Sequence, residues 1–375
     1  MKCIPLPGAR PCHNGGVIKI DIRPVWRFRA KTERAFDFQL ITILGELDAT
    51  GKLTRAAEKA EISYRHAWNL VAEWEEFFGA PLVVKERGRG STLTALGERL
   101  LWAGRRAQAR LEPELDNLAA EFARSLNESL HDRPSGLAMQ ASHDFAIGGL
   151  RDIWGAEGAG IELQYKGSFD ALAALRRGEC DVAGFHVPMG PLGQLMTRRY
   201  AECLPLENYR LISFVRRTQG LMVKPGNPKD IHTVADLCRN DVRMVNRQRG
   251  SGTRALLEFL ISADGLDRAR MQGYENEEVT HGAVAALIAG NQADVGIGVQ
   301  AAAALYRLEF VPLVVERYYL ACRAAHVETP AIRKLLEFLR GKRFAQMVAE
   351  LPGYGTDKAG KVLDAFEVEE PAAPA

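Results

Sequence analysis

Three short segments of the chain place small or hydroxyl residues where a strand gives way to a helix. They are Ser142-His143-Asp144, Gly167-Ser168-Phe169 and residues 249–254, which read RGSGTR. At a helix start, free backbone N–H groups and the positive end of the helix dipole attract an anion, and glycine lets a ligand approach the backbone closely. One such junction is weak support, because serine and threonine cap many helices. Three in one fold predict a donor-rich, neutral binding cleft for a small anion.

A second group of residues is suited to nucleic acid. Behind Ser63, a good N-cap, an apolar stripe with helical spacing predicts a helix whose opposite face is polar and aromatic near its N-terminus. That end of a recognition helix reaches base edges. A tight arginine–glycine turn between short predicted strands at 82–85 and 91–93 is suited to phosphates. The predicted DNA-binding residues are Ser63, Tyr64, Arg65, Trp68, Asn69, Arg87 and Arg89.

These residues lie within a predicted winged helix-turn-helix domain over residues 31–93, with earlier helices at 37–49 and 53–60. Residues 1–30 precede it as an extension with one possible strand at 17–28. A long amphipathic helix follows within residues 94–133, mildly broken by Pro113. We expect it to join two or four copies of the chain through residues 94–130. A helix that only spaces the domains is the alternative.

Composition sets the broad class of protein. The 375 residues have room for two or three domains, and the net charge of +2 is unevenly placed, with seven basic and two acidic residues between Lys85 and Arg110. Six scattered cysteines suggest neither a disulfide framework nor a zinc site. No apolar run of about 18 residues predicts a membrane span, and the N-terminus lacks a secretory signal. We expect a cytoplasmic protein with no membrane partner.

Residues 134–375 are predicted to form an α/β domain, because strands and helices alternate along them. Two lobes are expected. One comprises residues 137–206 with 308–351, and the other comprises residues 213–298. Segments 209–215 and 300–310 are expected to cross between them. Ligands of such folds bind at the carboxyl ends of the strands.

Two family resemblances follow from motifs in the chain. Residues 37–101, through ISYRHAW, GRG and LTALGERLL, resemble the DNA-binding domain of LysR-type regulators and, more closely, of the molybdate-responsive ModE regulators. Residues 137–355, through ASHD, YKGS, GECDVAGFHVP, VNRQRGSGTR and ADVGIG, resemble the type 2 periplasmic-binding-protein fold, within a group related to molybdate-binding proteins. The ligand-binding residues predicted from the junctions and this resemblance are Ser142, His143, Ser168, His186, Ser251, Gly252, Thr253, Arg254, Thr280, His281 and Tyr318.

The sequence therefore predicts a transcriptional regulator that binds an operator in double-stranded DNA and senses a small anionic effector. Molybdate or tungstate is the favoured effector, and formate or a similar small carboxylate is the next. The ModE ligand residues do not carry over, because they lie in a β-domain that this chain lacks. No nucleophile elbow, Walker loop or spaced metal motif predicts an enzyme, a cofactor or a metal site. The alternative is a cytoplasmic oxyanion carrier or buffer that does not regulate genes.

Overall fold

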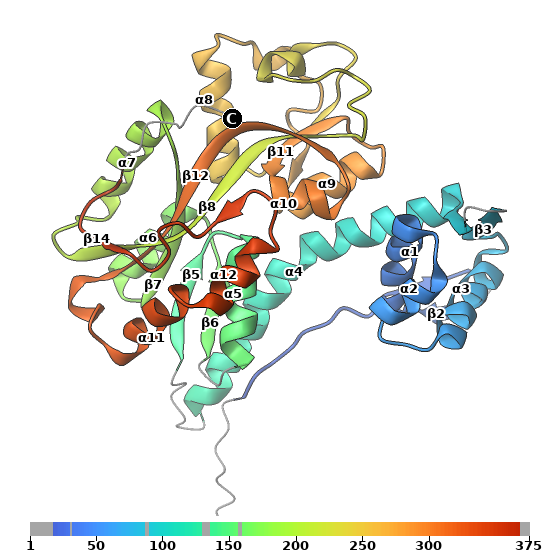
Figure 1. Ribbon diagram of the computed structural model, residues 1–375, viewed down its shortest axis with the longest axis horizontal. Coiled ribbons are helices and arrows are strands. Elements are labelled where there is room, and N and C mark those ends of the chain that lie inside the picture. The colour runs from blue at the N-terminus through green and yellow to red at the C-terminus, as the bar shows by residue number, and fades with distance from the viewer. Residues whose placement is uncertain (1–17, 31, 87–89, 130–135, 157–159, 368–375) are drawn as a thin grey trace, which may run out of the picture.

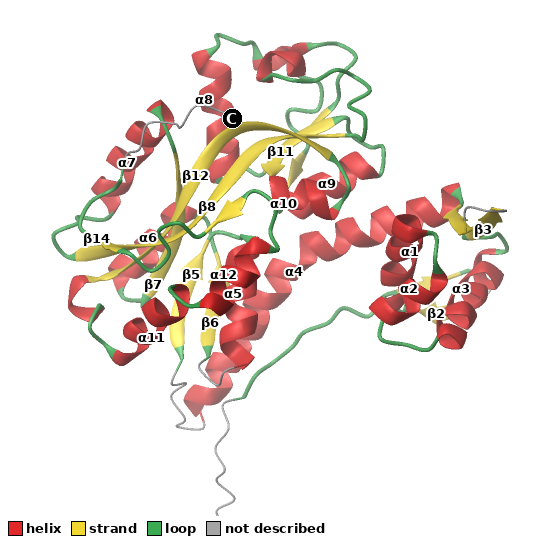
Figure 2. Ribbon diagram, viewed as in Figure 1, coloured by secondary structure: helices red, strands yellow, loops and turns green. Residues whose placement is uncertain are grey.

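The computed structural model describes residues 18–30, 32–86, 90–129, 136–156 and 160–367. The protein is mixed α/β, with a small helical domain joined by one long helix to a larger domain built on a sheet (Figure 1). Figure 2 shows helices covering both faces of that sheet. The fold is thus a winged helix-turn-helix followed by a two-lobed α/β domain.

The small domain has the elements that its sequence predicts. Helices α1 (Gln39–Thr50), α2 (Leu53–Lys59) and α3 (Tyr64–Phe78) precede a two-stranded wing, β3 (Val83–Glu86) and β4 (Gly90–Leu93). Ser63 caps α3 by accepting from the backbone N–H of His66, and Gly79 ends the helix at a φ of 65°. The wing is anchored to α1, because the Ser91 amide donates to the Gly51 carbonyl.

The N-terminal segment differs from its prediction. A strand was expected over residues 17–28, but the chain is extended without strand pairing up to Trp26. Only β1 (Arg27–Arg29) forms, and it pairs with β2 (Glu33–Ala35). Aromatic packing explains where pairing begins, since Phe28 contacts Trp74 and Phe36, with ring centroids 5.3 and 5.1 Å apart. Residue 17 lies outside the described residues.

Helix α4 (Ala95–Ser129) is the single connection that leads from the wing into the large domain. The Thr94 hydroxyl caps it by accepting from the Gly97 amide, 3.1 Å away. It runs beside α9 (His281–Ala289) and beside the edge strand β6 (Ile161–Tyr165). The helix also carries Pro113 in its interior.

The large domain is built on one sheet with the strand order β10-β9-β11-β8-β12-β7-β5-β6. Lobe I holds β5 (Leu137–Ala141), β6 and β7 (Val182–Pro188) with helices α5 (Phe145–Ala156), α6 (Ser168–Arg177), α7 (Pro191–Cys203), α11 (Pro330–Leu339) and α12 (Lys342–Ala349). Lobe II holds β9 (Met244–Arg247), β10 (Glu277–Glu278) and β11 (Val295–Val299) with helices α8 (Gly252–Ala263), α9 and α10 (Gln300–Leu305). Short strands β13 (Tyr354–Gly355) and β14 (Val362–Leu363) pair with β8.

Two strands of 15 residues each, β8 (Tyr209–Val223) and β12 (Glu309–Arg323), pass through both lobes. They pair antiparallel, and Glu316 lies opposite Arg217 near the middle of the pair. The expected crossing at 300–310 is therefore wrong, because residues 300–305 form α10 and the crossing lies within β12. The continuous ladder to β8 makes β12 one strand, with register shifts between Pro312 and Val314 and between Tyr318 and Tyr319.

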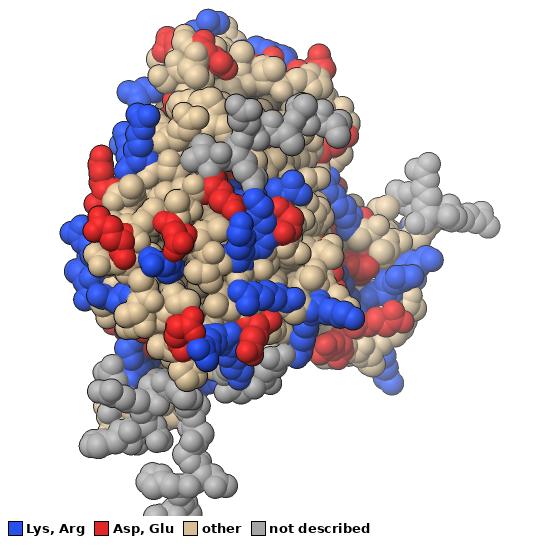
Figure 3. Space-filling model, turned by 60° about the vertical axis from the view of Figure 1, so that its left-hand side comes forward, with Lys and Arg blue, Asp and Glu red and all other residues tan. Residues whose placement is uncertain are grey.

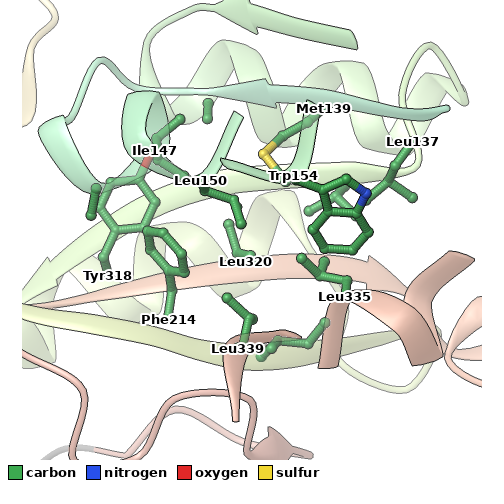
Figure 4. Close-up of a cluster of buried hydrophobic side chains, with 14 of the residues drawn as sticks. Leu137, Met139, Ile147, Leu150, Trp154, Phe214, Tyr318, Leu320, Leu335 and Leu339 are labelled. Carbon is green, nitrogen blue, oxygen red and sulfur yellow. The ribbon is translucent and has the colours of Figure 1, made fainter. Parts of the chain in front are cut away.

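The core of lobe I lies between the sheet and helices α5, α11 and α12. Figure 4 shows Trp154 and Leu150 of α5 packed near Met139 of β5 and Leu320 of β12. Apolar clusters also pack against α8 and against α9 in lobe II. Because each lobe has its own buried core, a ligand between the lobes meets two preformed walls.

Candidate functional site

A cavity of about 390 Å³ lies between the two lobes. Its walls are the strand ends and helix starts of both lobes, together with one side of helix α4. Eight of the eleven predicted ligand residues line it: Ser142, His143, Ser168, His186, Ser251, Gly252, Thr253 and His281. The three predicted junctions therefore meet at one place.

Arg254, Thr280 and Tyr318 do not line this cavity, so the prediction that they lie at the ligand needs correction. Arg254 is buried in ion pairs with Glu258 and Glu277, at 2.8 and 3.4 Å. Thr280 caps α9 by accepting from the Ala283 amide, and its hydroxyl donates to the Ala109 carbonyl, 2.9 Å away. Each of these side chains has local partners that hold it away from the cavity.

Tyr318 supports the cavity wall from behind. It is fully buried, and its hydroxyl donates to the Ser142 carbonyl over 2.9 Å and lies 3.0 Å from Ser142 Oγ. Burial raises the pKa of this hydroxyl well above its usual range, so it stays protonated and keeps its proton to donate. Tyr318 is thus placed to orient Ser142.

Two buried guanidinium groups replace the neutral site that the sequence predicted. The first is Arg217, whose Nη1 lies 2.6 Å from Asp144 Oδ2 and whose Nη2 lies 2.9 Å from Glu316 Oε2. Burial opposes its charge, but the two carboxylates outweigh burial and raise its pKa. Arg217 therefore joins both crossing strands and α5 beneath the cavity, with its charge balanced.

The second is Arg247, at the end of β9, which is only 6% exposed. Among the described residues, no hydrogen-bond acceptor meets its Nε or its Nη1. Burial, reinforced by the positive charge of Arg217, lowers its pKa to about 9, although Glu278 acts in the opposite direction. The cavity wall thus holds a buried cation, two of whose donors have no acceptor among the described residues.

Three histidines surround the same space as neutral donors or acceptors. Burial lowers the pKa of His186 to about 4 and that of His143 to about 4, and it holds the pKa of His281 well below its usual value. His186 Nδ1 lies 3.3 Å from Ser142 Oγ. Within the described chain, His186 Nε2 and His281 Nδ1 are buried without a hydrogen-bond partner. Their open ring nitrogens add to the unused polar groups around the cavity.

The two lobes touch across the cleft. A Cβ atom at Gly252, on lobe II, would lie 2.0 Å from Nε2 of His186 on lobe I. A Cβ atom at Gly167 on lobe I would lie 3.8 Å from the Gly250 carbonyl oxygen on lobe II. Glycine is therefore required at position 252 for the lobes to meet as they do.

Four of the seven predicted DNA-binding residues, Tyr64, Arg65, Trp68 and Asn69, lie near the start of helix α3, and Ser63 caps that helix. Tyr64 and Trp68 are 52% and 45% exposed, unusual for large rings, and Arg65 and Asn69 are also exposed. The ammonium of Lys85, from the wing, lies 4.6 Å from the centre of the Trp68 ring. Arg87 and Arg89 lie outside the described residues. Lys85 is the residue that joins the wing to the recognition surface.

On the face of the molecule in Figure 3, basic and acidic side chains are interspersed. Within the described ranges, no cluster of three histidine, cysteine or acidic residues is arranged to hold a metal ion. In the same part of the chain, no helix is both long and apolar enough to cross a bilayer.

The sequence missed several residues of the site. Arg217 stands in the apolar strand run LISFVRRTQGLMV, and Arg247 ends the run VRMVNR. An arginine inside a buried strand pattern was the available signal, because such a charge needs a partner or a ligand. Residues Arg110, Glu114 and Asn117 of α4 also line the cavity, and no local pattern distinguishes them.

Comparison with known proteins assigns both domains. Residues 38–98 match the family model described as bacterial regulatory helix-turn-helix protein, lysR family, and residues 154–340 match the PBP superfamily domain. The uncharacterized protein YvgK of Bacillus subtilis (strain 168) is 34% identical over 200 residues, which cover 53% of this chain and 64% of YvgK. The molybdenum-pterin-binding protein MopB of Rhodobacter capsulatus is 28% identical over 106 residues, covering 27% of this chain and 38% of MopB. The chain thus spans less than two thirds of either relative.

Solved structures show similarity at low sequence identity. An H2O2-bound mutant of OxyR from Corynebacterium glutamicum is 15% identical, with a TM-score of 0.40, and the match covers 82% of this chain and 90% of that one.

Proposed function

We propose that this chain, which carries a lysR-family helix-turn-helix domain followed by a PBP superfamily domain, is a DNA-binding transcriptional regulator whose operator binding responds to a small anion. One observation supports an anionic effector: the buried Arg247 guanidinium, which lines the cavity between the lobes and meets no acceptor at Nε or Nη1 among the described residues. An ion buried without a counter-charge costs several kcal/mol, and a bound anion would offset that cost. The protein would act in the cytoplasm, where operator DNA is found.

A tetrahedral oxyanion, molybdate or tungstate, is the favoured effector. The donors available to it are the Arg247 guanidinium, the Ser142 and Ser251 hydroxyls and the start of α8. MopB, one relative, is named as a molybdenum-pterin-binding protein, which supports this class of ligand. The cavity of about 390 Å³ is much larger than a five-atom oxyanion needs, so such an anion would share it with ordered water. Formate, or a similar small carboxylate, uses the same donors and is the second choice.

The contacts between the DNA-binding domain and lobe II suggest how anion binding would alter DNA binding. Arg307, which follows α10, pairs with Asp48 of α1 at 3.1 Å and donates to the Gly45 carbonyl. The Arg105 guanidinium lies 5.1 Å from the Trp102 ring and 5.6 Å from the Tyr306 ring. The DNA-binding domain is therefore held to lobe II. Closure of lobe II on an anion would move the recognition helix with it.

Two copies of the chain would pair through α4. Leu111, Leu118 and Phe122, on α4, are 39%, 46% and 53% exposed, and their spacing follows one face of a coiled coil. A dimer built on this stripe gives two recognition helices for two half-sites. A tetramer would join two such dimers.

The first test is a thermal-shift titration of the full chain with molybdate, tungstate, sulfate and formate. An anion at 100 times its dissociation constant stabilises its domain by about 2.7 kcal/mol. Operator binding is then measured with and without the anion that stabilises, over a series of salt concentrations. A steep linear fall of log affinity with log salt is expected. Weak DNA binding with a flat salt dependence would favour a carrier or buffer instead.

The DNA contacts are tested separately. Arg65→Ala and Asn69→Ala are expected to reduce preference for the operator over other sequences, because they lie where base edges are read. Lys85→Ala is expected to weaken binding to all DNA alike, because a wing lysine meets phosphate. Equal losses of specificity in all three variants would contradict these roles.

A further inference from the structure

Helix α4 is fixed to both lobes of the large domain. Toward lobe II, Arg106 Nη2 lies 2.7 Å from Glu278 Oε1, and the Ala109 carbonyl accepts the Thr280 hydroxyl. Toward lobe I, the Asn117 side chain makes two hydrogen bonds to the backbone of Tyr165, of 2.6 and 3.0 Å. One helix therefore closes the side of the cleft.

Pro113 explains the Thr280 contact. Proline has no N–H, so the carbonyl four residues earlier, at Ala109, loses its partner within the helix. The Thr280 hydroxyl takes the place of that N–H. Thr280 is also the N-cap of α9, and the next residue, His281, lines the cavity. The helix α4 stays continuous through Pro113, and its one missing backbone hydrogen bond lies next to the cavity.

Arg110 follows Ala109 and is part of the cavity wall. Its side chain is 49% exposed, and its Nε lies 3.6 Å from Glu278 Oε2, beyond a hydrogen bond. Glu278 already accepts from Arg106 over 2.8 Å. One carboxylate therefore faces two guanidinium groups. The Glu114 carboxylate, one turn further along α4, and the Lys166 ammonium also line the cavity, so basic groups outnumber acidic ones on this wall.

We propose that Arg110 is an effector-binding residue and that the linker helix α4 is itself a wall of the anion site. This inference rests on the proposed anion-sensing function and places part of the site outside the PBP superfamily domain. The anion would then be contacted directly by the helix that carries the DNA-binding domain. Anion binding would then act on the DNA-binding domain through α4 as well as through closure of the lobes.

The experiment compares Arg110→Gln with Arg106→Gln in the full chain. Both residues face Glu278, but only Arg110 lines the cavity, so Arg106→Gln controls for the lost ion pair. Affinities for molybdate and for formate are measured by isothermal titration. Loss of one charge-assisted hydrogen bond weakens binding by about 10- to 100-fold. We expect that loss in Arg110→Gln, a smaller loss in Arg110→Lys, and a change under about 2-fold in Arg106→Gln.

A second readout separates contact from simple support of the wall. At saturating molybdate or formate, the ratio of operator affinities with and without the anion is expected to move toward 1 in Arg110→Gln and to stay as in wild type in Arg106→Gln. If the anion affinity of Arg110→Gln equals that of wild type while Arg247→Met loses binding, the role of Arg110 is overturned and the proposed anion-sensing function is not. Equal losses in the two glutamine variants would overturn it too. A wild-type chain that binds neither probe would refute the proposed function together with this inference.

Discussion

Replacing Arg247 by methionine tests the proposed anion site at the residue whose buried charge is most unfavourable for folding. Methionine replaces the aliphatic stem of arginine, reaches about as far as Nε and carries no charge, so it removes the buried guanidinium and keeps the packing of the stem. In the absence of any anion, the variant is expected to be more stable than wild type. In the presence of the anion, it is expected to bind far more weakly. These opposite signs follow from the same unpaired charge.

The structure sets the size of both effects. A pKa lowered from 12.5 to about 9 corresponds to about 5 kcal/mol against the buried charge. Replacing the arginine by methionine removes part of this energetic cost. The free energy of unfolding should therefore rise by about 2–4 kcal/mol, which corresponds to a rise of roughly 5–15 °C in Tm. A bound anion would lose its charge-assisted hydrogen bonds to this guanidinium, and two such bonds contribute about 3–6 kcal/mol. That loss is about 100- to 10,000-fold in affinity.

The assay is urea unfolding with and without molybdate or formate, and the matched control is Arg254→Met. Arg254 is also buried, at 3% exposure, but it is paired with Glu258 and Glu277 and lies off the cavity. Its replacement leaves carboxylates without their partner, so it should destabilise the chain and leave anion affinity within about 3-fold. An Arg247→Met variant that is less stable than wild type without anion, or that binds the anion normally, would refute the reasoning.

Three further predictions concern the lobes, the histidines and the dimer. Gly252→Ala places a methyl group 2.0 Å from His186 Nε2, so the lobes should fail to meet and the anion affinity measured by titration calorimetry should fall at least about tenfold. The control is Gly148→Ala, whose methyl group would make an ordinary contact at 3.5 Å. Normal anion affinity in Gly252→Ala would show that closure of the lobes is not needed. The pKa of His186 is about 4 in the folded chain and about 6.5 in the unfolded chain, so the unfolded chain binds more protons between these pH values. The free energy of unfolding should therefore be at its full value above pH 6.5 and fall by about 3 kcal/mol as the pH drops to 4. His186→Gln should lose that share of the pH dependence in urea unfolding, and an unchanged profile would count against a buried neutral imidazole. Phe122→Glu puts a charge into the exposed stripe of α4 and should shift the chain toward monomer in analytical ultracentrifugation, whereas an unchanged assembly would place the interface elsewhere.

The sequence by itself determined the elements and the chemistry of their ends. The recognition helix was predictable because its cap, Ser63, its apolar stripe and its terminal Gly79 are local signals within one or two helical turns. The strands β5 and β8 also follow a local signal, because their mostly apolar residues are bounded by polar segments. The Ser142 and Ser168 junctions lie together because β5 and β6 are neighbouring parallel strands whose carboxyl ends share an edge of the sheet. The Ser251 junction follows β9 of lobe II, so it reaches the same cavity only through the arrangement of the two lobes.

Only the tertiary structure decided which of these residues face the cavity and what charge the cavity holds. Arg217 is neutralised by Asp144 and by Glu316, which lie 73 and 99 residues away in the chain. Thr280 has the same type of helix start as Ser251, yet its hydroxyl is taken by a carbonyl of α4, 171 residues earlier. Caps and periodicity depend on neighbours within a few residues, whereas burial and ion pairing depend on which distant elements meet. For that reason the helix start at Thr280 was visible in the sequence, and the charge of Arg247 facing the cavity was not.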